Sequence, residues 1–324
     1  MIVAGIDEAG YGPVLGPLVT ALSAFSGPAE ALDDLWRALR PAVRKRPPTG
    51  RSASWRALPV VDSKELHRGG AGFADLEIVA LAFSAWAGGR APRTVGEFLG
   101  RHLVGGRLPL ASTPWYGDAF PDRSLPRTAE PGRIDREVKK LARAATRARV
   151  SPTRIAVRPL LADEFNRRSE SCGTKAQVLF QLNVDLLEDL RGRSTPPFRV
   201  RCDRHGGRRH YADLLESAFP MEGVSILGEH RARSRYRVGR PEEGLEVEYV
   251  VGGEREGLEV ALASIFAKYT RELFVEALND HFADRVDGLK RTAGYWVDGH
   301  RFVKDLEDAG ALREDERVRL VRRR

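Results

Sequence analysis

Short apolar runs along the chain alternate with longer stretches of helical period. The first run, MIVAGI at 1–6, is bounded by glycine and acids, and its length predicts a buried strand. A second run at 14–25 contains β-branched residues and several Gly and Pro residues that disfavour a helix, so we expect a hairpin. Apolar runs at 153–161, 197–203 and 245–253 predict later strands.

Helical patterns separate these strands. They predict helices at 30–43, 134–149, 174–190, 214–219 and 257–282. The segment VVDSKEL at 60–66 predicts the end of a strand followed by a helix, with Asp62 or Ser63 as the N-cap. Strands and helices that alternate after an N-terminal hairpin indicate an α/β fold with a mixed central sheet flanked by helices.

The length of 324 residues allows one large domain or two ordinary ones. Residues 88–133 are rich in Gly, Pro and Arg with scattered aromatic side chains, which is typical of an extended excursion. We expect one domain over 1–324, with an insertion or extended excursion at about 88–150.

Composition limits the partners. Apolar residues make up 42% and charged residues 30%, which is typical of a soluble globular protein, and the net charge of +8 favours a polyanion such as nucleic acid. A general excess of Arg in the source proteome would explain the charge equally well. The cysteines, Cys172 and Cys202, have no metal-type spacing, and no apolar run has membrane-spanning length. We therefore expect a cytoplasmic monomer with no membrane partner.

Acidic residues follow several of the predicted strands. Asp7 and Glu8 come after the first strand, Asp203 ends a later one, and Glu256 lies at the start of the long helix at 257–282. Acids at the carboxyl ends of neighbouring strands meet at one rim of an α/β sheet, and oxygen ligands suit Mg²⁺ or Mn²⁺. Each acid taken alone is better explained as a solvated turn residue or a helix cap. The adjacent pair is harder to explain without a bound cation, because burying two like charges is costly.

The segment GIDEAGYGPVLGPLV at 5–19 closely resembles the N-terminal signature of ribonuclease HII, which usually has GRG where this chain has GYG. Further motifs resemble that family in the same order. They are VDSKEL at 61–66, VRCD at 200–203, ALASIFAKYTREL at 261–273 and TAGYW at 292–296, the last followed by a helix near His300. Residues 88–150 have no counterpart in this resemblance.

The resemblance implies an RNase H-like catalytic domain that hydrolyses RNA in RNA–DNA hybrids, or ribonucleotides embedded in DNA. The family uses four acids as catalytic metal ligands, and three of them match Asp7, Glu8 and Asp203. Counting back without gaps from the Ala-Lys pair of ALASIFAK puts the fourth at Glu256, with Glu254 and Glu259 as alternatives. Two Mg²⁺ or Mn²⁺ ions about 3.5–4 Å apart would activate a water and stabilise the leaving 3′ oxygen.

The resemblance also implies how substrate is bound. The tripeptide Gly10, Tyr11 and Gly12 matches the family segment whose backbone reads the 2′-hydroxyl, the group that distinguishes RNA from DNA. Tyr11 stands where the family has Arg, so it offers a ring face and a hydroxyl instead of a charged fork. Residues that match phosphate-binding or sugar-packing positions are Lys64, Lys268, Thr270, Arg271 and Tyr295. Without the resemblance, a solvated helix face is the better explanation for the first four, and a half-buried core position explains Tyr295 equally well.

The segment DRHGGRRHY at 203–211 crowds basic residues around a Gly-Gly turn. We interpret it as a clamp for phosphate, with a solvated loop as the alternative. Cys202 is expected to be a buried strand residue. Two other classes of function remain open: a nuclease that acts on a branched or single-stranded substrate, and a non-catalytic nucleic-acid-binding module.

Overall fold

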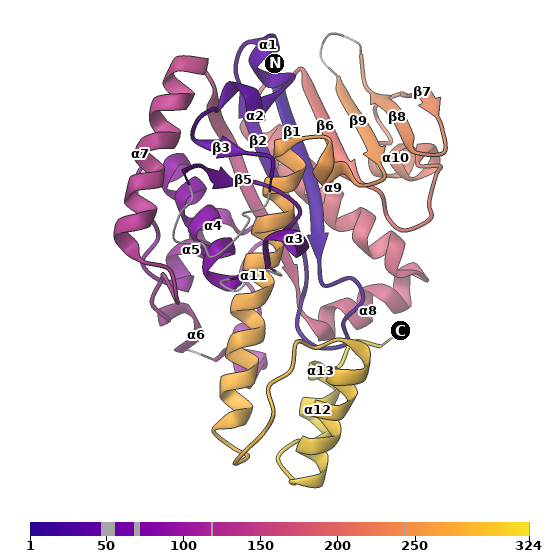
Figure 1. Ribbon diagram of the computed structural model, residues 1–324. Coiled ribbons are helices and arrows are strands. Elements are labelled where there is room, and N and C mark those ends of the chain that lie inside the picture. The colour runs from indigo at the N-terminus through magenta and orange to yellow at the C-terminus, as the bar shows by residue number, and fades with distance from the viewer. Residues whose placement is uncertain (47–55, 68–71, 118, 241, 243, 324) are drawn as a thin grey trace.

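The computed structural model describes residues 1–46, 56–67, 72–117, 119–240, 242 and 244–323. In this part of the chain, strands from both halves of the sequence form a seven-stranded sheet in the order β5-β2-β1-β6-β9-β8-β7 (Figure 1). Their bounds are β1 Ile2–Ala9, β2 Leu18–Ser26, β5 Ser151–Leu160, β6 Phe198–Asp203, β7 Val224–Glu229, β8 Arg233–Val238 and β9 Leu245–Val250. A separate short pair joins β3 Val43–Arg44 to β4 Leu58–Pro59.

The centre of the sheet is parallel and its sides are antiparallel. β1 pairs in parallel with β6, and β6 with β9, while β2, β5, β8 and β7 pair antiparallel with their neighbours. The expected mixed sheet flanked by helices is therefore confirmed, and so is the N-terminal hairpin. Because β1, β6 and β9 run the same way, their carboxyl ends meet at one rim.

Alternate residues of β1 face different cores, as the two-residue period of a strand requires. Val3 belongs to the core that contains α11 (Leu258–Ala283) on one face, whereas Ala4 and Ile6 belong to the core on the other face, which contains α9 (Lys175–Arg193). Helix α11 approaches β1 so closely that a Cβ on Gly5 would lie 2.3 Å from the backbone of Glu259. Glycine at this position lets the long helix lie against the central strand.

Most helices expected from the sequence are present. The bounds are α1 Ala29–Leu32, α2 Leu35–Ala38, α3 Ser63–His67, α4 Gly72–Gly88, α5 Val95–His102, α6 Ala119–Asp122, α7 Pro131–Ala148, α8 Ala162–Cys172, α9 Lys175–Arg193, α10 Ala212–Ala218, α11 Leu258–Ala283, α12 Trp296–Asp308 and α13 Glu314–Leu320, with 3₁₀ turns η2 Leu110–Ser112, η3 Pro114–Tyr116 and η4 Gly253–Arg255. The helix expected at 30–43 is split into α1 and α2, because Asp34 caps the second helix by accepting a hydrogen bond from the Arg37 amide. The Asp62 carboxylate likewise accepts from the Lys64 amide at the start of α3.

Residues 88–150 are not the extended excursion expected from the composition of 88–133, and their being an insertion stays a prediction. They contain α5, η2, η3, α6 and α7, and Phe98, Trp115 and Phe120 are buried in the same core as α11. That the whole chain forms one catalytic domain stays a prediction. Among the described residues, no helix is long and apolar enough to cross a membrane.

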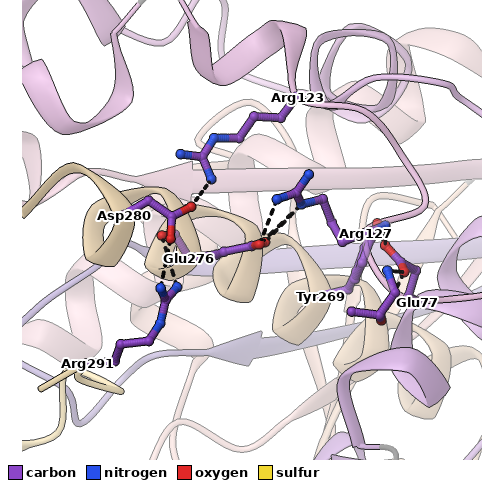
Figure 2. Close-up of polar contacts among 8 residues, drawn as sticks. Glu77, Arg123, Arg127, Tyr269, Glu276, Asp280 and Arg291 are labelled. Atoms are coloured by element: carbon purple, nitrogen blue, oxygen red, sulfur yellow. Dashed lines mark hydrogen bonds and ion pairs between the residues drawn. The ribbon is translucent and has the colours of Figure 1, made fainter. Parts of the chain in front are cut away.

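A buried carboxylate and two ion pairs fasten this region to α11 (Figure 2). Glu77 on α4 is fully buried and accepts hydrogen bonds from the backbone amides of Arg127, Thr128 and Ala129 and from the Tyr269 hydroxyl. Two ion pairs extend the network to the outer turns of α11, Arg127–Glu276 at 2.9 Å and Arg123–Asp280 at 2.6 Å. One face of the central helix is thereby held by residues that the family resemblance does not cover.

Candidate active site

Three acidic side chains come together at the rim where the parallel strands end. Asp7 and Glu8 belong to the last residues of β1, and Asp203 is the last residue of β6. One carboxylate oxygen from each lies within 4.8 Å of the others, and this is the one group of at least three potential metal ligands within the described ranges. Oxygen ligands at this spacing suit a hard divalent cation.

The three carboxyl groups disfavour each other's charge. Burial, followed by the charges of Glu8 and Asp203, raises the pKa of Asp7 well above its usual value. Burial and the charge of Asp203 raise the pKa of Glu8 to about 8, although Lys64 opposes this shift. A bound divalent cation would remove the repulsion, so this donor set fits Mg²⁺ or Mn²⁺.

Backbone amides also hold Asp203 in place. Its Oδ1 accepts hydrogen bonds from the amides of Gly252 and Gly253, at 3.1 and 3.0 Å, in the turn that follows β9. Burial raises the pKa of Asp203, and these amides partly offset the rise. The turn that follows β9 therefore orients Asp203 at the end of the neighbouring strand β6.

The structure does not bring Glu256, the fourth acid expected from the sequence, into this group. The Glu256 carboxylate forms an ion pair with Arg233. Glu259 is buried and paired with Arg201. Glu254 interacts with the charge of one member of the cluster. Burial, and then the charges of Asp203 and Asp62, raise the pKa of its carboxyl group. The sequence placed the fourth acid by counting back along α11. The chain before Leu258 is not part of that helix but forms the 3₁₀ turn η4, so the count does not give the direction of each glutamate.

The two glycines of the GYG turn have different surroundings. Gly10 has a φ of +87°, and a Cβ there would lie 2.6 Å from the Pro17 carbonyl oxygen. Gly12 is exposed, has no positive φ, and a Cβ there would meet no atom within 4 Å. The fold therefore requires glycine at position 10 and does not require it at position 12.

Tyr11 lies between opposite charges. Its ring is half-buried against an apolar cluster that contains Leu18 and Phe165. Burial and then the charge of Glu8 raise the pKa of its hydroxyl, and Arg208 opposes them. Tyr11 also lines a cavity of about 440 Å³ together with Arg208 and the rest of the loop at 205–210.

The structure places part of the expected phosphate-binding set inside the protein. Thr270 and Arg271 are 0% and 1% exposed, so neither presents a donor at the surface. Arg271 donates instead to the carbonyl oxygens of Leu15 and Ala293, and thereby holds two loops beside the GYG turn. Lys268 is engaged by Glu272 at 2.6 Å. The structure therefore buries Thr270 and Arg271, where the sequence expected substrate-binding residues, and their contact with substrate stays a prediction.

Two other expected binding residues remain available. Lys64 is exposed, and its charge lowers the pKa values of Glu8 and Asp203, which puts it beside the acids. Tyr295 is 52% exposed, and the Arg271 guanidinium lies over its ring at 5.9 Å from the centroid. Both side chains are accessible to a ligand.

The basic loop after β6 divides into an inner and an outer part. Arg204 and His205 are buried; Arg204 donates to the Arg231 carbonyl at 2.6 Å, and His205 contacts Asn183 at 2.8 Å. Arg208 is partly exposed, and Arg209 and His210 are exposed. A phosphate clamp at this loop is thus limited to the outer residues. Cys202 is buried in β6, as expected.

Arg322 is a contributor to the site that the sequence did not indicate. Its side chain is 3% exposed and donates to the Gly10 carbonyl oxygen at 2.6 Å and to that of Pro13. Burial, and then repulsion by Arg271, lower its pKa to about 9. A residue 312 positions away along the chain therefore braces the GYG turn, and no local pattern signals such a contact.

The chain matches no protein-family model and no curated protein sequence. It is similar to solved ribonuclease structures. RNase HII in a PCNA complex from Archaeoglobus fulgidus is 16% identical, with a TM-score of 0.47 over 100% of this chain and 95% of that chain. Ribonuclease H2 from Pyrococcus horikoshii is 15% identical, with a TM-score of 0.40 over 98% and 96% of the two chains. Bst-RNase HIII in complex with Mn²⁺ is also 15% identical, with a TM-score of 0.41 over 99% of this chain and 66% of that one.

Proposed function

We propose that the protein is a metal-dependent endonuclease that hydrolyses the RNA strand of RNA–DNA hybrids, or ribonucleotides embedded in DNA. The observation that carries this proposal is the convergence of Asp7, Glu8 and Asp203 at the rim of the parallel strands. The ordered motifs that resemble ribonuclease HII support the same chemistry. A bound Mg²⁺ or Mn²⁺ would supply positive charge to a scissile phosphate and lower the pKa of a water.

The chain's own residues divide the remaining tasks. Asp7, Glu8 and Asp203 hold the cation, and Glu254 takes the place of the fourth acid. Gly10 and Gly12 let the backbone approach a ribose and select its 2′-hydroxyl. Lys64, next to the acids, attracts a phosphate. Tyr295 offers a face for a sugar, and the outer arginines of the loop at 205–210 contact further phosphates.

A nuclease acting on a different nucleic acid is the second candidate, favoured by Tyr11. A tyrosine between Glu8 and Arg208 cannot make the bidentate charged contact of an arginine. A non-catalytic binding module is less well supported, since uncompensated acids would repel a polyanion.

Cleavage of matched duplexes containing no, one or several ribonucleotides, in Mg²⁺ or Mn²⁺, separates these candidates. We expect cuts at ribonucleotides, none in all-DNA duplex, and loss of activity with a chelator. Equal cutting of the all-DNA duplex would favour the second candidate. Tight binding without any cleavage would favour the binding module.

Substitutions test the acids. Asp7→Asn and Asp203→Asn should abolish cleavage while thermal stability stays unchanged or rises, because repulsion within the cluster is relieved. Glu254→Gln should lower the rate roughly tenfold or more by weakening the cation site, and Glu256→Gln, two residues further along the chain, is the matched control. Full activity of Asp7→Asn would contradict the proposed site, and a larger loss in Glu256→Gln would contradict the choice of Glu254.

A further inference from the structure

A cavity of about 800 Å³ opens beside the start of α11, outside the acid cluster. Its walls come from α2 and β3, from the first residues of β6, and from Glu256 to Glu259 at the beginning of α11. In Figure 1, α2 and β3 lie near the end of the sheet where β1 begins. The chain that forms this wall contains no acidic residue between Asp34 and Asp62.

Cationic side chains from one segment line the cavity, and among the described residues none has a carboxylate partner. They are Arg37, Arg40, Arg44, Lys45 and Arg46. Lys45 lies over the Trp36 ring, with its Nζ 4.7 Å from the centroid, and the Nε of Arg44 is buried without a hydrogen-bond partner. Like charges gathered at this density repel each other unless an anion lies among them.

The acids around the cavity do not neutralise these cations, because each acid already forms a hydrogen bond or an ion pair with another group. Asp34 caps α2 through the Arg37 amide at 3.0 Å. The rest form ion pairs with arginines outside the cationic segment: Asp33–Arg199, Glu256–Arg233 and Glu259–Arg201. The cavity therefore presents uncompensated positive charge.

We infer that this cavity binds the phosphodiester backbone of the nucleic acid whose scissile bond lies at the acid cluster, an inference that rests on the proposed function. Glu256 and Gly257 line the cavity, and η4, directly before them, carries Glu254 and the amide of Gly253 that binds Asp203. The short segment from Gly253 to Gly257 thus connects the acid cluster to the cavity. One strand of a bound nucleic acid would therefore contact both. The cavity extends the binding footprint beyond the cleaved nucleotide.

The salt dependence of binding tests this inference. Affinity for RNA–DNA hybrids of increasing length is measured against salt, in Ca²⁺ or with a chelator to suppress cleavage. Arg37→Gln with Arg46→Gln should make the slope of log K against log[salt] shallower by about 1.8 for two lost phosphate contacts. The difference from wild type should vanish for the shortest hybrids. With cleavage restored, KM should rise while kcat is unchanged, since both side chains are exposed and contribute uniform binding.

Two control variants make the result specific. Arg37→Lys with Arg46→Lys keeps the charge and should keep the slope. Lys139→Gln with Lys304→Gln removes the same charge from exposed positions outside the cavity and should leave the slope nearly unchanged.

An unchanged slope in the glutamine variant, or an equal change in the Lys139/Lys304 control, would overturn the inference. Failure of the proposed function is a separate outcome. In that case the wild type would cleave no ribonucleotide, while its binding slope would still depend on Arg37 and Arg46.

Discussion

At the scale of single residues, the turn after β1 combines a glycine that the backbone requires with one that it does not. Gly10 has a left-handed φ and is crowded by Pro17, whereas a side chain at Gly12 would project into open space. An exposed position that is free of packing constraints, four residues after Glu8, is suited to a ligand. The turn is held from outside by Arg271 and Arg322, so its shape depends on residues far away in the sequence.

The variant Gly12→Ala tests whether Gly12 is needed for substrate binding and not for folding. Its unfolding free energy should match wild type or exceed it by up to about 1 kcal/mol, because the methyl group meets no atom and the unfolded chain loses freedom. Cleavage at ribonucleotides should fall, because that methyl group occupies the space in which a ribose approaches the backbone. Denaturant titration and initial rates measure the two effects. Gly10→Ala, which should lose both stability and activity, is the comparison, and a fully active Gly12→Ala would refute this role.

Arg322→Met tests whether the buried guanidinium positions the turn. Methionine keeps the apolar length, and it removes a buried charge that Arg271 repels, so the melting temperature should change little. The Gly10 and Pro13 carbonyl groups lose their donor, and kcat/KM should fall roughly tenfold or more. Arg322→Lys should recover part of the rate. A large loss of stability with unaltered kinetics would show that Arg322 only stabilises the fold.

At the scale of helices and strands, the longest patterned segments were predictable, whereas the buried helix α4 and shorter helices such as α5 and α8 were not. The long helix predicted at 257–282 is observed as Leu258–Ala283, and the hairpin strands are in place. Helix α4 was not predicted, since it is buried along most of its length and shows no polar stripe of helical period. The direction of Glu254 was missed because it depends on η4, and Arg322 was missed because its contacts are tertiary.

Glu77→Gln tests how strongly the 88–150 region is held to α11. An amide has one acceptor oxygen, so it cannot accept all the backbone and hydroxyl donors that now share the carboxylate (Figure 2). The free energy of unfolding should fall by about 2–4 kcal/mol. Tyr269→Phe, which removes one donor, should cost about 1 kcal/mol. Equal small losses in chemical denaturation would show that the carboxylate is not the centre of the network.

At the scale of the whole molecule, buried neutral histidines make the free energy of unfolding fall as the pH is lowered. The His102 ring contacts the Ser84 hydroxyl at 2.7 Å and the Ile155 carbonyl at 2.9 Å, an arrangement that suits the neutral ring. Burial lowers its pKa from 6.5 to about 3. Burial also lowers the pKa of His205 to about 3. Between pH 6.5 and about 3, these two histidines are therefore protonated in the unfolded chain and remain neutral in the folded chain.

The sign of the pH effect follows from these shifts. Each histidine contributes stability that is fully present above pH 6.5 and is lost as the pH falls from 6.5 toward 3. Between pH 6.5 and 5 the loss from His102 is about 2 kcal/mol. His102→Gln should flatten the fall of unfolding free energy over this range, and His230→Gln, at an exposed position, should not. Parallel curves for His102→Gln and wild type would contradict this assignment.

The buried Glu77 carboxylate also has a consequence for hydrogen exchange. The amides of Arg127, Thr128 and Ala129 belong to no helix or strand, yet all three donate to that one group. They can exchange with solvent only when the loop leaves the carboxylate, so all three should exchange together, as slowly as amides within α4. An irregular segment whose Gly- and Pro-rich surroundings suggest a solvated loop should therefore have exchange rates typical of the core.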